Sequence, residues 1–418
     1  MALWVYTEKL NARIAYVFKQ LFGQFLGVEV AFCTDADEFA TKAGAKICYA
    51  SQALGHAPFF KKHPFIDEVG VATVDLAFAD WEGLKIPFAV DTSALPFDVF
   101  AASFYLLSRY EEYLDAEKDV HGRYPAKASL AFKNVFLNRP LVDEWASLLS
   151  RMIKQRFPEF ETKPRTFRFI PTLDIDRPYY FRNEGFLRKA AKYVLNGFKK
   201  DPFDIYEQVR KWDEEFGLQT QYFFLMGNKH ANDVSPGAND KLYQKVIKEA
   251  VQHHHVGLHP SYYSNQNSGA INKEKEDLEQ ISGTTIFRSR QHYLMLQLPE
   301  TYRNLIAAGI REDYTLAFAD AAGFRASTCS PFFWYDLLQE QETDLLLYPT
   351  AVMDQTLRRY MALQPEEAVQ EITSLMDAIK NVKGTFVSLW HNESINDFGV
   401  FRGWKKVYLE LLRLGAEQ

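Results

Sequence analysis

The second half of the chain alternates short apolar runs with amphipathic stretches, and this alternation limits the folds that it can adopt. Over roughly 250 residues, the runs are short enough for strands, and the stretches carry apolar residues at helical spacing. The pattern predicts strands at 167–176, 218–227, 256–259, 343–349 and 385–391, and helices at 201–217, 239–253, 299–309, 331–340, 365–384 and 401–414. Strands and helices that alternate in this way are typical of a parallel α/β sheet or a (β/α) barrel.

The first part of the chain has a different, mixed pattern. Helical spacing of apolar residues predicts helices within 7–26, 96–114 and 139–157, and strand-like runs lie at 27–35, 45–50 and 71–79. The segment 156–166 is polar and contains proline, which is typical of a linker. A chain of 418 residues is long enough for two domains. We therefore expect a mixed α/β domain over residues 1–160 and a (β/α) domain over residues 166–418.

Charge, cysteine content and hydropathy exclude several classes of protein. The chain has 48 Lys and Arg against 54 Asp and Glu, and this net charge of −6 gives no bulk attraction for nucleic acid. Cys33, Cys48 and Cys329 are far apart and predict neither a disulfide framework nor a cysteine zinc site. The first apolar stretch lacks the pattern of a secretory signal, and no run of about 18 uncharged apolar residues occurs. We expect a cytoplasmic protein without a membrane span.

Polar side chains gather where the predicted strands end. Asp174 and Asp176 end the first strand of the second half, and His259 and His391 end two later strands. In parallel α/β folds the chemistry lies at the C-terminal ends of the strands, so these positions predict a functional site. The loops near them add four more candidates: Arg290, His292, Arg325 and Asp354.

Six motifs in a fixed order suggest a family for residues 167–414. The chain reads TLDIDRP (172–178), QYFFLMG (221–227), HHVGLHPSYYS (254–264), GFRASTCSPFFWYDL (323–337), LYPTAVMD (347–354) and SLWH (388–391). In order and spacing, this set resembles the polysaccharide deacetylases, a carbohydrate esterase family with a distorted (β/α) barrel. The first half resembles an uncharacterised domain that precedes divergent deacetylase-like domains in some bacteria, and that resemblance implies no activity.

The resemblance implies a metal-dependent hydrolase that removes an acyl group from an N-acylated sugar or glycoconjugate. Members of the family hold a divalent metal, usually zinc, with one Asp and two His, and use a second Asp as general base and a His as general acid. Carried over to this chain, Asp174 is the base, His391 the acid, and Asp176 and His259 are metal ligands. Arg325 and Asp354 match the pair that orients the base and the acid.

The chain departs from the family pattern at two positions. Ile175 separates two acids that are adjacent in the family, so Asp174 and Asp176 share one face of the strand and reach one site only if its end bends. Tyr263 stands where the second metal His is expected, and a phenol with a pKa near 10 is a poor zinc ligand. Either another residue completes the site, with His292 the best candidate, or the metal is weakly bound or absent.

Other interpretations remain open beside the enzyme. The chain is alternatively a non-catalytic carbohydrate-binding protein on a degenerate deacetylase fold, or an interaction scaffold whose first half carries the function. Arg290 is either a site residue or an ion-pair partner, and Glu393 either holds the tautomer of His391 or is exposed. The aromatic run 332–335 either lines a sugar cleft or packs in the core, and helical spacing favours the core.

Overall fold

The alternating pattern of the second half forms one sheet. We describe the chain from a computed structural model, which covers residues 2–180 and 201–417. Within these residues, nine strands pair in the order β12-β13-β11-β10-β9-β8-β7-β15-β14, and all neighbours are parallel except β12 and β13. The strands are β7 (Arg168–Ile175), β8 (Gln221–Leu225), β9 (Val256–His259), β10 (Arg288–Ser289), β11 (Glu312–Asp313), β12 (Phe332–Asp336), β13 (Gln341–Leu347), β14 (Val352–Met353) and β15 (Thr385–His391). The predicted mixed α/β class with a parallel sheet is confirmed.

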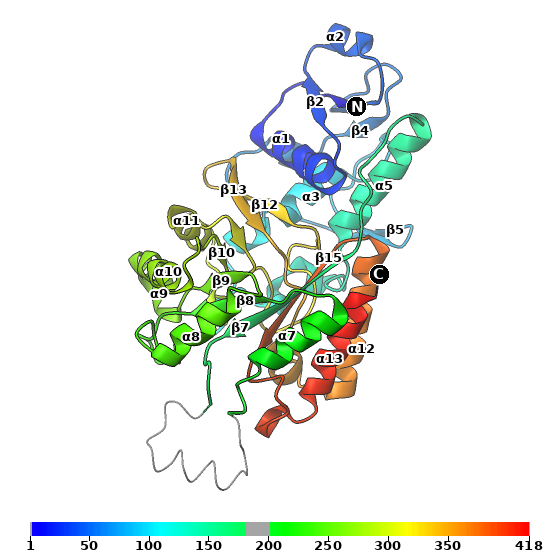
Figure 1. The fold of residues 1–418 in the computed structure, drawn as a ribbon. Helices are drawn as coiled ribbons and strands as arrows, with labels where there is room; N and C mark the ends of the chain where they lie inside the picture. Colours follow the sequence, from blue (N-terminus) through cyan, green and yellow to red (C-terminus); the bar gives the residue numbers. More distant parts are fainter. Residues whose placement is uncertain (1, 181–200, 418) are drawn as a thin grey trace.

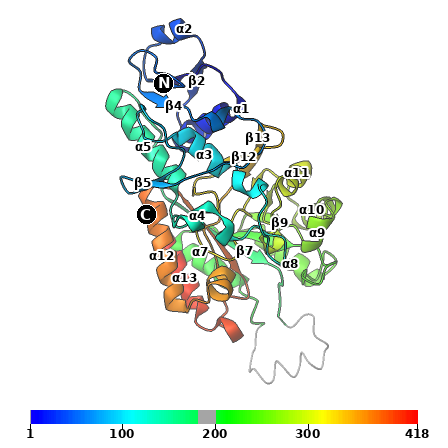
Figure 2. The same cartoon turned by 180° about the vertical axis from the view of Figure 1, so that it is seen from behind.

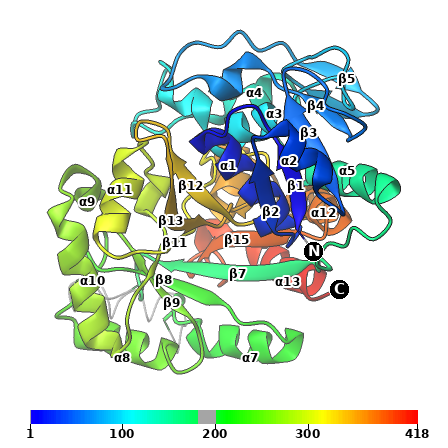
Figure 3. The same cartoon turned by 90° about the horizontal axis from the view of Figure 1, so that it is seen from above.

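Helices cover this sheet because its central strands are apolar on both faces. Every residue of β8 and β9 is buried, which is typical of strands in a parallel sheet. In Figure 3, α7 and α8 flank β7 and β8 on one side, and Figure 2 shows α12 and α13 side by side. The helices are α7 (Tyr206–Phe216), α8 (Lys241–Ala250), α9 (Tyr262–Gln266), α10 (Gly269–Ser282), α11 (Glu300–Ala307), α12 (Pro365–Asn381) and α13 (Trp404–Ala416). Across the described residues, no helix combines the length and the apolar character that a bilayer span requires.

The first part of the chain forms a second, smaller parallel sheet with the strand order β2-β1-β3-β4. It lies at one end of the molecule, drawn in blue in Figure 1. Asp98 caps the buried helix α3, since its carboxylate accepts hydrogen bonds from the backbone N–H of Phe100 and Ala101. The elements here are β1 (Leu3–Tyr6), β2 (Val30–Cys33), β3 (Lys46–Ala50), β4 (Phe59–Lys61), the hairpin β5 (Ala79–Trp81) and β6 (Leu84–Ile86), and the helices α1 (Ala12–Phe18), α2 (Ala36–Thr41), α3 (Val99–Leu107), α4 (Leu130–Lys133) and α5 (Leu141–Arg156).

Two sequence predictions of secondary structure are wrong. The segment 331–340, predicted as a helix, contains the strand β12, which pairs antiparallel with β13. Its aromatic run favours a strand, and a short apolar run does not distinguish a strand from a buried helix. The segment 71–79, predicted as a strand, has no regular structure before Ala79. The packing interpretation of the aromatic run is confirmed, because Phe332, Trp334 and Tyr335 are buried in the main hydrophobic cluster.

The two sheets are joined by a shared core and by polar contacts. The largest cluster of buried apolar side chains includes residues from both parts of the chain. The Tyr16 hydroxyl donates to the carbonyl of Phe333 at 2.7 Å, and the Gln20 side chain accepts from the N–H of the same residue at 3.1 Å. The part of the chain that forms the smaller sheet is called the first region below, and the part that forms the nine-stranded sheet the second region. Side chains from the first region therefore satisfy backbone groups of β12, the strand at one end of the nine-stranded sheet. The predicted domain limits, 1–160 and 166–418, stay a prediction.

Candidate metal and catalytic site

The polar residues predicted at strand ends lie at one edge of the nine-stranded sheet. Asp174, His259 and His391 stand at the ends of the parallel strands β7, β9 and β15. Because parallel strands share their direction, their C-terminal ends meet at the same edge. A pocket of about 620 Å³ opens there, within the range of ligand sites, and these three residues line it together with Asp176 and His292.

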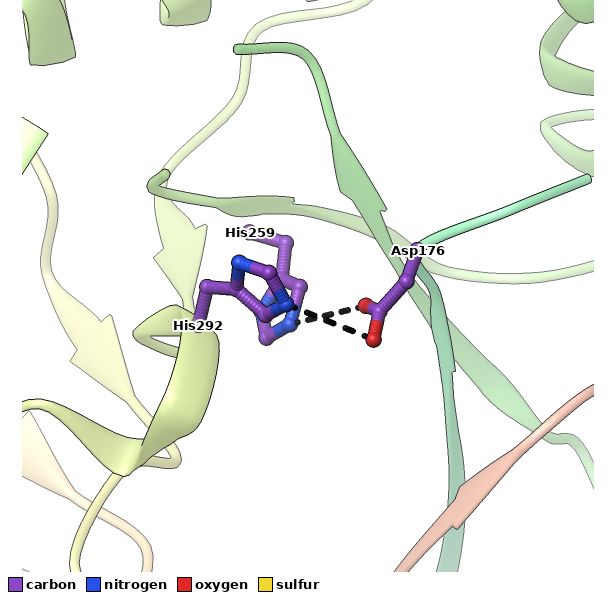
Figure 4. Close-up of side chains that lie close together, drawn as sticks. All are labelled: Asp176, His259 and His292. Atoms are coloured by element: carbon purple, nitrogen blue, oxygen red, sulfur yellow. Dashed lines mark ion pairs between the residues drawn. The ribbon is translucent and has the colours of Figure 1, made fainter. Parts of the chain in front are cut away.

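Asp176 and two histidines form a tight cluster in this pocket (Figure 4). The chain bends at Asp176, directly after β7, so its carboxylate reaches the same site as Asp174 despite the intervening Ile175. One carboxylate oxygen lies 3.2 Å from Nε2 of His259, and the other lies 3.4 Å from Nε2 of His292. The three potential ligand atoms lie within 4.8 Å of one another.

The other ring nitrogen of each histidine fixes its tautomer. Nδ1 of His259 contacts the carbonyl oxygen of Arg290, and Nδ1 of His292 lies 2.9 Å from a carboxylate oxygen of Asp233. Because both partners only accept hydrogen bonds, each Nδ1 carries the hydrogen, and the lone pair of a neutral ring stands on Nε2. An imidazole oriented by a carbonyl or a carboxylate is the usual arrangement behind a metal-bound histidine.

Two buried atoms of the cluster have no hydrogen-bond partner. They are Oδ1 of Asp176 and Nε2 of His259, which face each other across 3.2 Å. A carboxylate oxygen and an imidazole lone pair repel unless a cation or a proton lies between them. Two imidazole nitrogens and a carboxylate are a donor set that zinc accepts. The residues therefore fit a divalent metal ion.

Electrostatics in the cluster favour a positive charge. Burial alone would raise the pKa of Asp176, but the charges of His292 and His391 hold it well below its usual range. Burial opposes protonation of His292, yet Asp176 and Asp233 raise its pKa to about 9. A metal ion that binds at Nε2 would displace this proton, since a metal ligand must be deprotonated.

Asp174 lies beside the cluster and is held by a buried arginine. One carboxylate oxygen accepts a hydrogen bond from Nη1 of Arg290 at 2.9 Å, and the other lies 3.6 Å from Nε2 of His259. Arg290 is fully buried and also donates to Thr172 and to the carbonyl of Tyr314. This network fixes the direction of the Asp174 carboxylate and leaves one of its oxygens toward the cluster.

His391 faces the cluster from β15, the strand that pairs with β7, and Asp354 lies behind it. Nδ1 of His391 lies 2.8 Å from one oxygen of Asp354, and the backbone N–H of His391 donates to the other oxygen at 2.9 Å. Its Nε2 points toward Asp176, 3.8 Å from the nearer oxygen. Burial opposes protonation, but the charges of Asp354, Asp176 and Asp174 outweigh it and raise the pKa of His391 to about 10. The ring therefore carries a proton at neutral pH.

Three residues singled out in the sequence do not join this cluster. Arg325 forms a buried ion pair with Glu112 of the first region, at 2.9 and 2.6 Å, so Arg290 is the arginine that contacts the Asp174 carboxylate. Glu393 lines the pocket but pairs with Arg177 at 3.2 Å, while Asp354 orients His391. The ring of Tyr263 contacts Lys229, and His292 stands against Asp176 instead.

The site also contains residues that the sequence patterns did not indicate. Asp233, in the loop after β8, holds His292 and accepts the backbone N–H of Tyr262 and Tyr263. Its only signal is its place in the loop after an apolar strand. Arg123, from the first region, lines the pocket and donates to the carbonyl of Tyr293 at 2.7 Å and to the hydroxyl of Tyr360 at 3.0 Å. No local motif marks this contact.

Comparisons with known proteins give one family and several distant structures. Residues 3–158 match a family of unknown function, DUF7033. A polysaccharide deacetylase from Mycobacterium smegmatis, described as putative, aligns at 14% identity and TM-score 0.42 over 61% of this chain and 85% of that one. One from Bacillus cereus aligns at 14% and 0.31 over 60% and 88%, and a pseudoenzyme of the CE4 family from Bacillus anthracis at 10% and 0.32 over 59% and 61%. No curated protein matches the chain.

Proposed function

We propose that this protein is a metal-dependent hydrolase that removes an acyl group from an N-acylated sugar or a related glycoconjugate. The observation that carries the proposal is the Asp176 cluster, in which two imidazole Nε2 atoms and a carboxylate converge while each Nδ1 is bound elsewhere. The six motifs of the deacetylase type, in their order along residues 167–414, support the same reading. The proposal includes the distorted (β/α) barrel of that family and zinc as the metal.

In this proposal the metal is held by Asp176, His259 and His292. A bound zinc ion polarises a carbonyl and lowers the pKa of water. The residues around it accept and donate the protons of the reaction. Asp174, fixed by Arg290, accepts the proton of the attacking water as a new C–O bond forms at the acyl carbon.

His391 completes the reaction as the general acid. Its Nε2 donates a proton to the amide nitrogen as the C–N bond breaks, so that the products are a carboxylic acid and a free amino sugar. Asp354 keeps the ring in the required tautomer and stabilises its charged form. Arg325 has no part in this proposal, because Glu112 binds its guanidinium away from the pocket.

The test is acetate release from a panel of N-acetylated sugars and short glycans by zinc-loaded protein. Asp174→Asn should retain metal and fold but lose turnover by about 10²- to 10⁴-fold, the usual effect of losing a general base. Asp377→Asn, on the exposed face of α12, is the matched control and should hydrolyse at the wild-type rate. Wild-type turnover in Asp174→Asn would reject the mechanism. Binding of a sugar without hydrolysis would favour the non-catalytic alternative.

A further inference from the structure

The charged side chains that line the pocket divide into paired and unpaired groups. Arg123 pairs with Asp119, and Arg177 pairs with Glu393. The acids are also engaged, since Asp174 binds Arg290 and Asp176 belongs to the histidine cluster. Two cations remain, Arg358 and Arg359, and within residues 2–180 and 201–417 no carboxylate forms an ion pair with either of them.

These two arginines lie on one short segment beside the catalytic residues. They belong to the π-helical turn Thr356–Tyr360, which begins two residues after Asp354. The guanidinium of Arg358 stacks on the ring of Phe401 at 4.6 Å and donates to the Gln355 side chain at 3.2 Å. The side chain of Arg358 is half-buried, and Arg359 is exposed. The segment therefore presents two adjacent positive charges to the pocket, one of them held against an aromatic ring.

An ordinary solvated surface does not account for this arrangement. Adjacent like charges repel, and stacking removes part of the hydration of Arg358. The pocket acids that could offset this cost have other partners. A guanidinium presents a planar fork of donors that matches the oxygens of a phosphate or a carboxylate, and such bonds are stronger than neutral ones. The arrangement suits an anionic group of a ligand in the pocket.

We propose that the substrate carries an anionic group, a phosphate or a carboxylate, that Arg358 and Arg359 bind while its N-acyl group lies at the Asp176 cluster. The placement of the acyl group rests on the proposed function, whereas the anion contact does not. The substrate class is therefore an acidic N-acyl sugar and not a neutral polymer.

The experiment compares binding of three sugars by isothermal titration calorimetry: N-acetylglucosamine, N-acetylglucosamine 1-phosphate and N-acetylmuramic acid. We expect at least one acidic sugar to bind about tenfold or more tightly than the neutral one, and this advantage to shrink as salt is added. The double variant Arg358→Gln/Arg359→Gln should lose the advantage. The phosphate and carboxylate sugars identify which anion is preferred.

The control double variant, Arg402→Gln/Lys406→Gln, removes two exposed charges from the neighbouring segment outside the pocket and should keep the advantage. If the first double variant is unstable, Arg359→Gln alone removes an exposed side chain and should reduce the advantage. Equal binding of all three sugars would overturn the proposal, as would an advantage that survives in the double variant, because the anion would then contact the metal or another group. Acetate release is recorded separately: arginine-dependent binding without hydrolysis supports the anion contact and favours the non-catalytic alternative over the proposed function.

Discussion

Two carboxylates, one at the contact between the two sheets and one in the pocket, have opposite surroundings. Asp143, on α5, accepts hydrogen bonds from Arg165, in the segment before β7, at 2.7 Å, and from three groups of the second region: the Thr328 hydroxyl at 2.6 Å, the N–H of Cys329 at 3.0 Å and the hydroxyl of Ser330. Asp176 has one oxygen without any hydrogen bond and faces ring nitrogens that lie 3.2 to 3.8 Å away.

The difference suits a structural role for Asp143 and the proposed metal-binding role for Asp176. A buried charge whose oxygens are all satisfied stabilises the contact it belongs to, and losing it leaves its donors unpaired. A buried carboxylate oxygen that lacks a donor costs stability, and a fold retains this cost where a ligand uses the atom. Asp143 therefore holds the two regions together, and Asp176 is available to a cation.

The largest expected effect is on stability at Asp143. Asp143→Ala should lower the free energy of unfolding by about 3–5 kcal/mol, because it removes the charge partner of Arg165 and the acceptor of three further donors in a buried site. Asp176→Asn should lower it by less, because one oxygen of Asp176 accepts no hydrogen bond and because His292 and His391 keep Asp233 and Asp354 as partners. Urea denaturation of both variants measures the contrast. Equal losses would remove the distinction between the two carboxylates.

The second prediction concerns stabilisation by metal. Zinc at about one hundred times its dissociation constant should raise the free energy of unfolding by about 2.7 kcal/mol, because it binds the folded state at the Asp176 cluster. Denaturation with and without zinc gives the increment. Asp176→Asn should lose it, and His253→Ala, which removes an exposed histidine outside the cluster, should keep it. An increment that persists in Asp176→Asn would place the metal elsewhere.

A third carboxylate, Glu274, is buried and hydrogen-bonded, and its effect is expected in the pH dependence of the free energy of unfolding. It accepts from the N–H and hydroxyl of Ser261, and burial raises its pKa from 4.5 to about 7. The folded state therefore holds a proton that the unfolded chain releases, so stability falls as pH rises from about 4.5 to 7, by up to about 1.4 kcal/mol per pH unit. Glu274→Gln should remove this part of the slope, measured by urea denaturation across the window. The exposed Glu276→Gln should leave it, and an unchanged slope in Glu274→Gln would contradict the assignment.

The smallest effect is expected at Arg123, which extends from the first region into the pocket. Arg123→Gln should lower kcat/KM by less than about tenfold, since it removes hydrogen bonds to Tyr293 and Tyr360 that contribute about 1 kcal/mol. Steady-state kinetics measure this change, and the exposed Arg151→Gln on α5 should have no effect. An equal change in both variants would show that the first region affects the pocket only through overall stability.

The strand ends of the second half could be predicted because their signals are local. Asp174, His259 and His391 follow apolar runs, and parallel pairing brings the ends of such runs together. The choice between arginines could not be predicted. Arg325 binds Glu112, which lies 213 residues earlier in the chain, and Arg290 takes the contact with Asp174. A sequence pattern contains no information about such a distant partner.

The same limit explains the wrong helix prediction at 331–340 and the site contacts that the sequence did not show. The run at 332–335 is equally apolar as a strand or as a helix, and its pairing with β13 decides between them. Asp233 is one acid in a polar loop, and only the folded chain shows that it orients His292. His292 itself was proposed because the site required a second imidazole, and the structure places it against Asp176.

The hydrogen bonds from Tyr16 and Gln20 to Phe333 have a consequence for self-association. A terminal strand whose backbone groups lack partners can pair with a strand of another molecule, and proteins commonly cover such an edge with a helix. Here the cover comes from residues near the start of the chain, more than three hundred residues before the strand that they protect. A chain shortened to residues 166–418 would retain the Asp176 cluster but expose β12. Its first defect would be aggregation through that edge, and the pocket would lose Arg123.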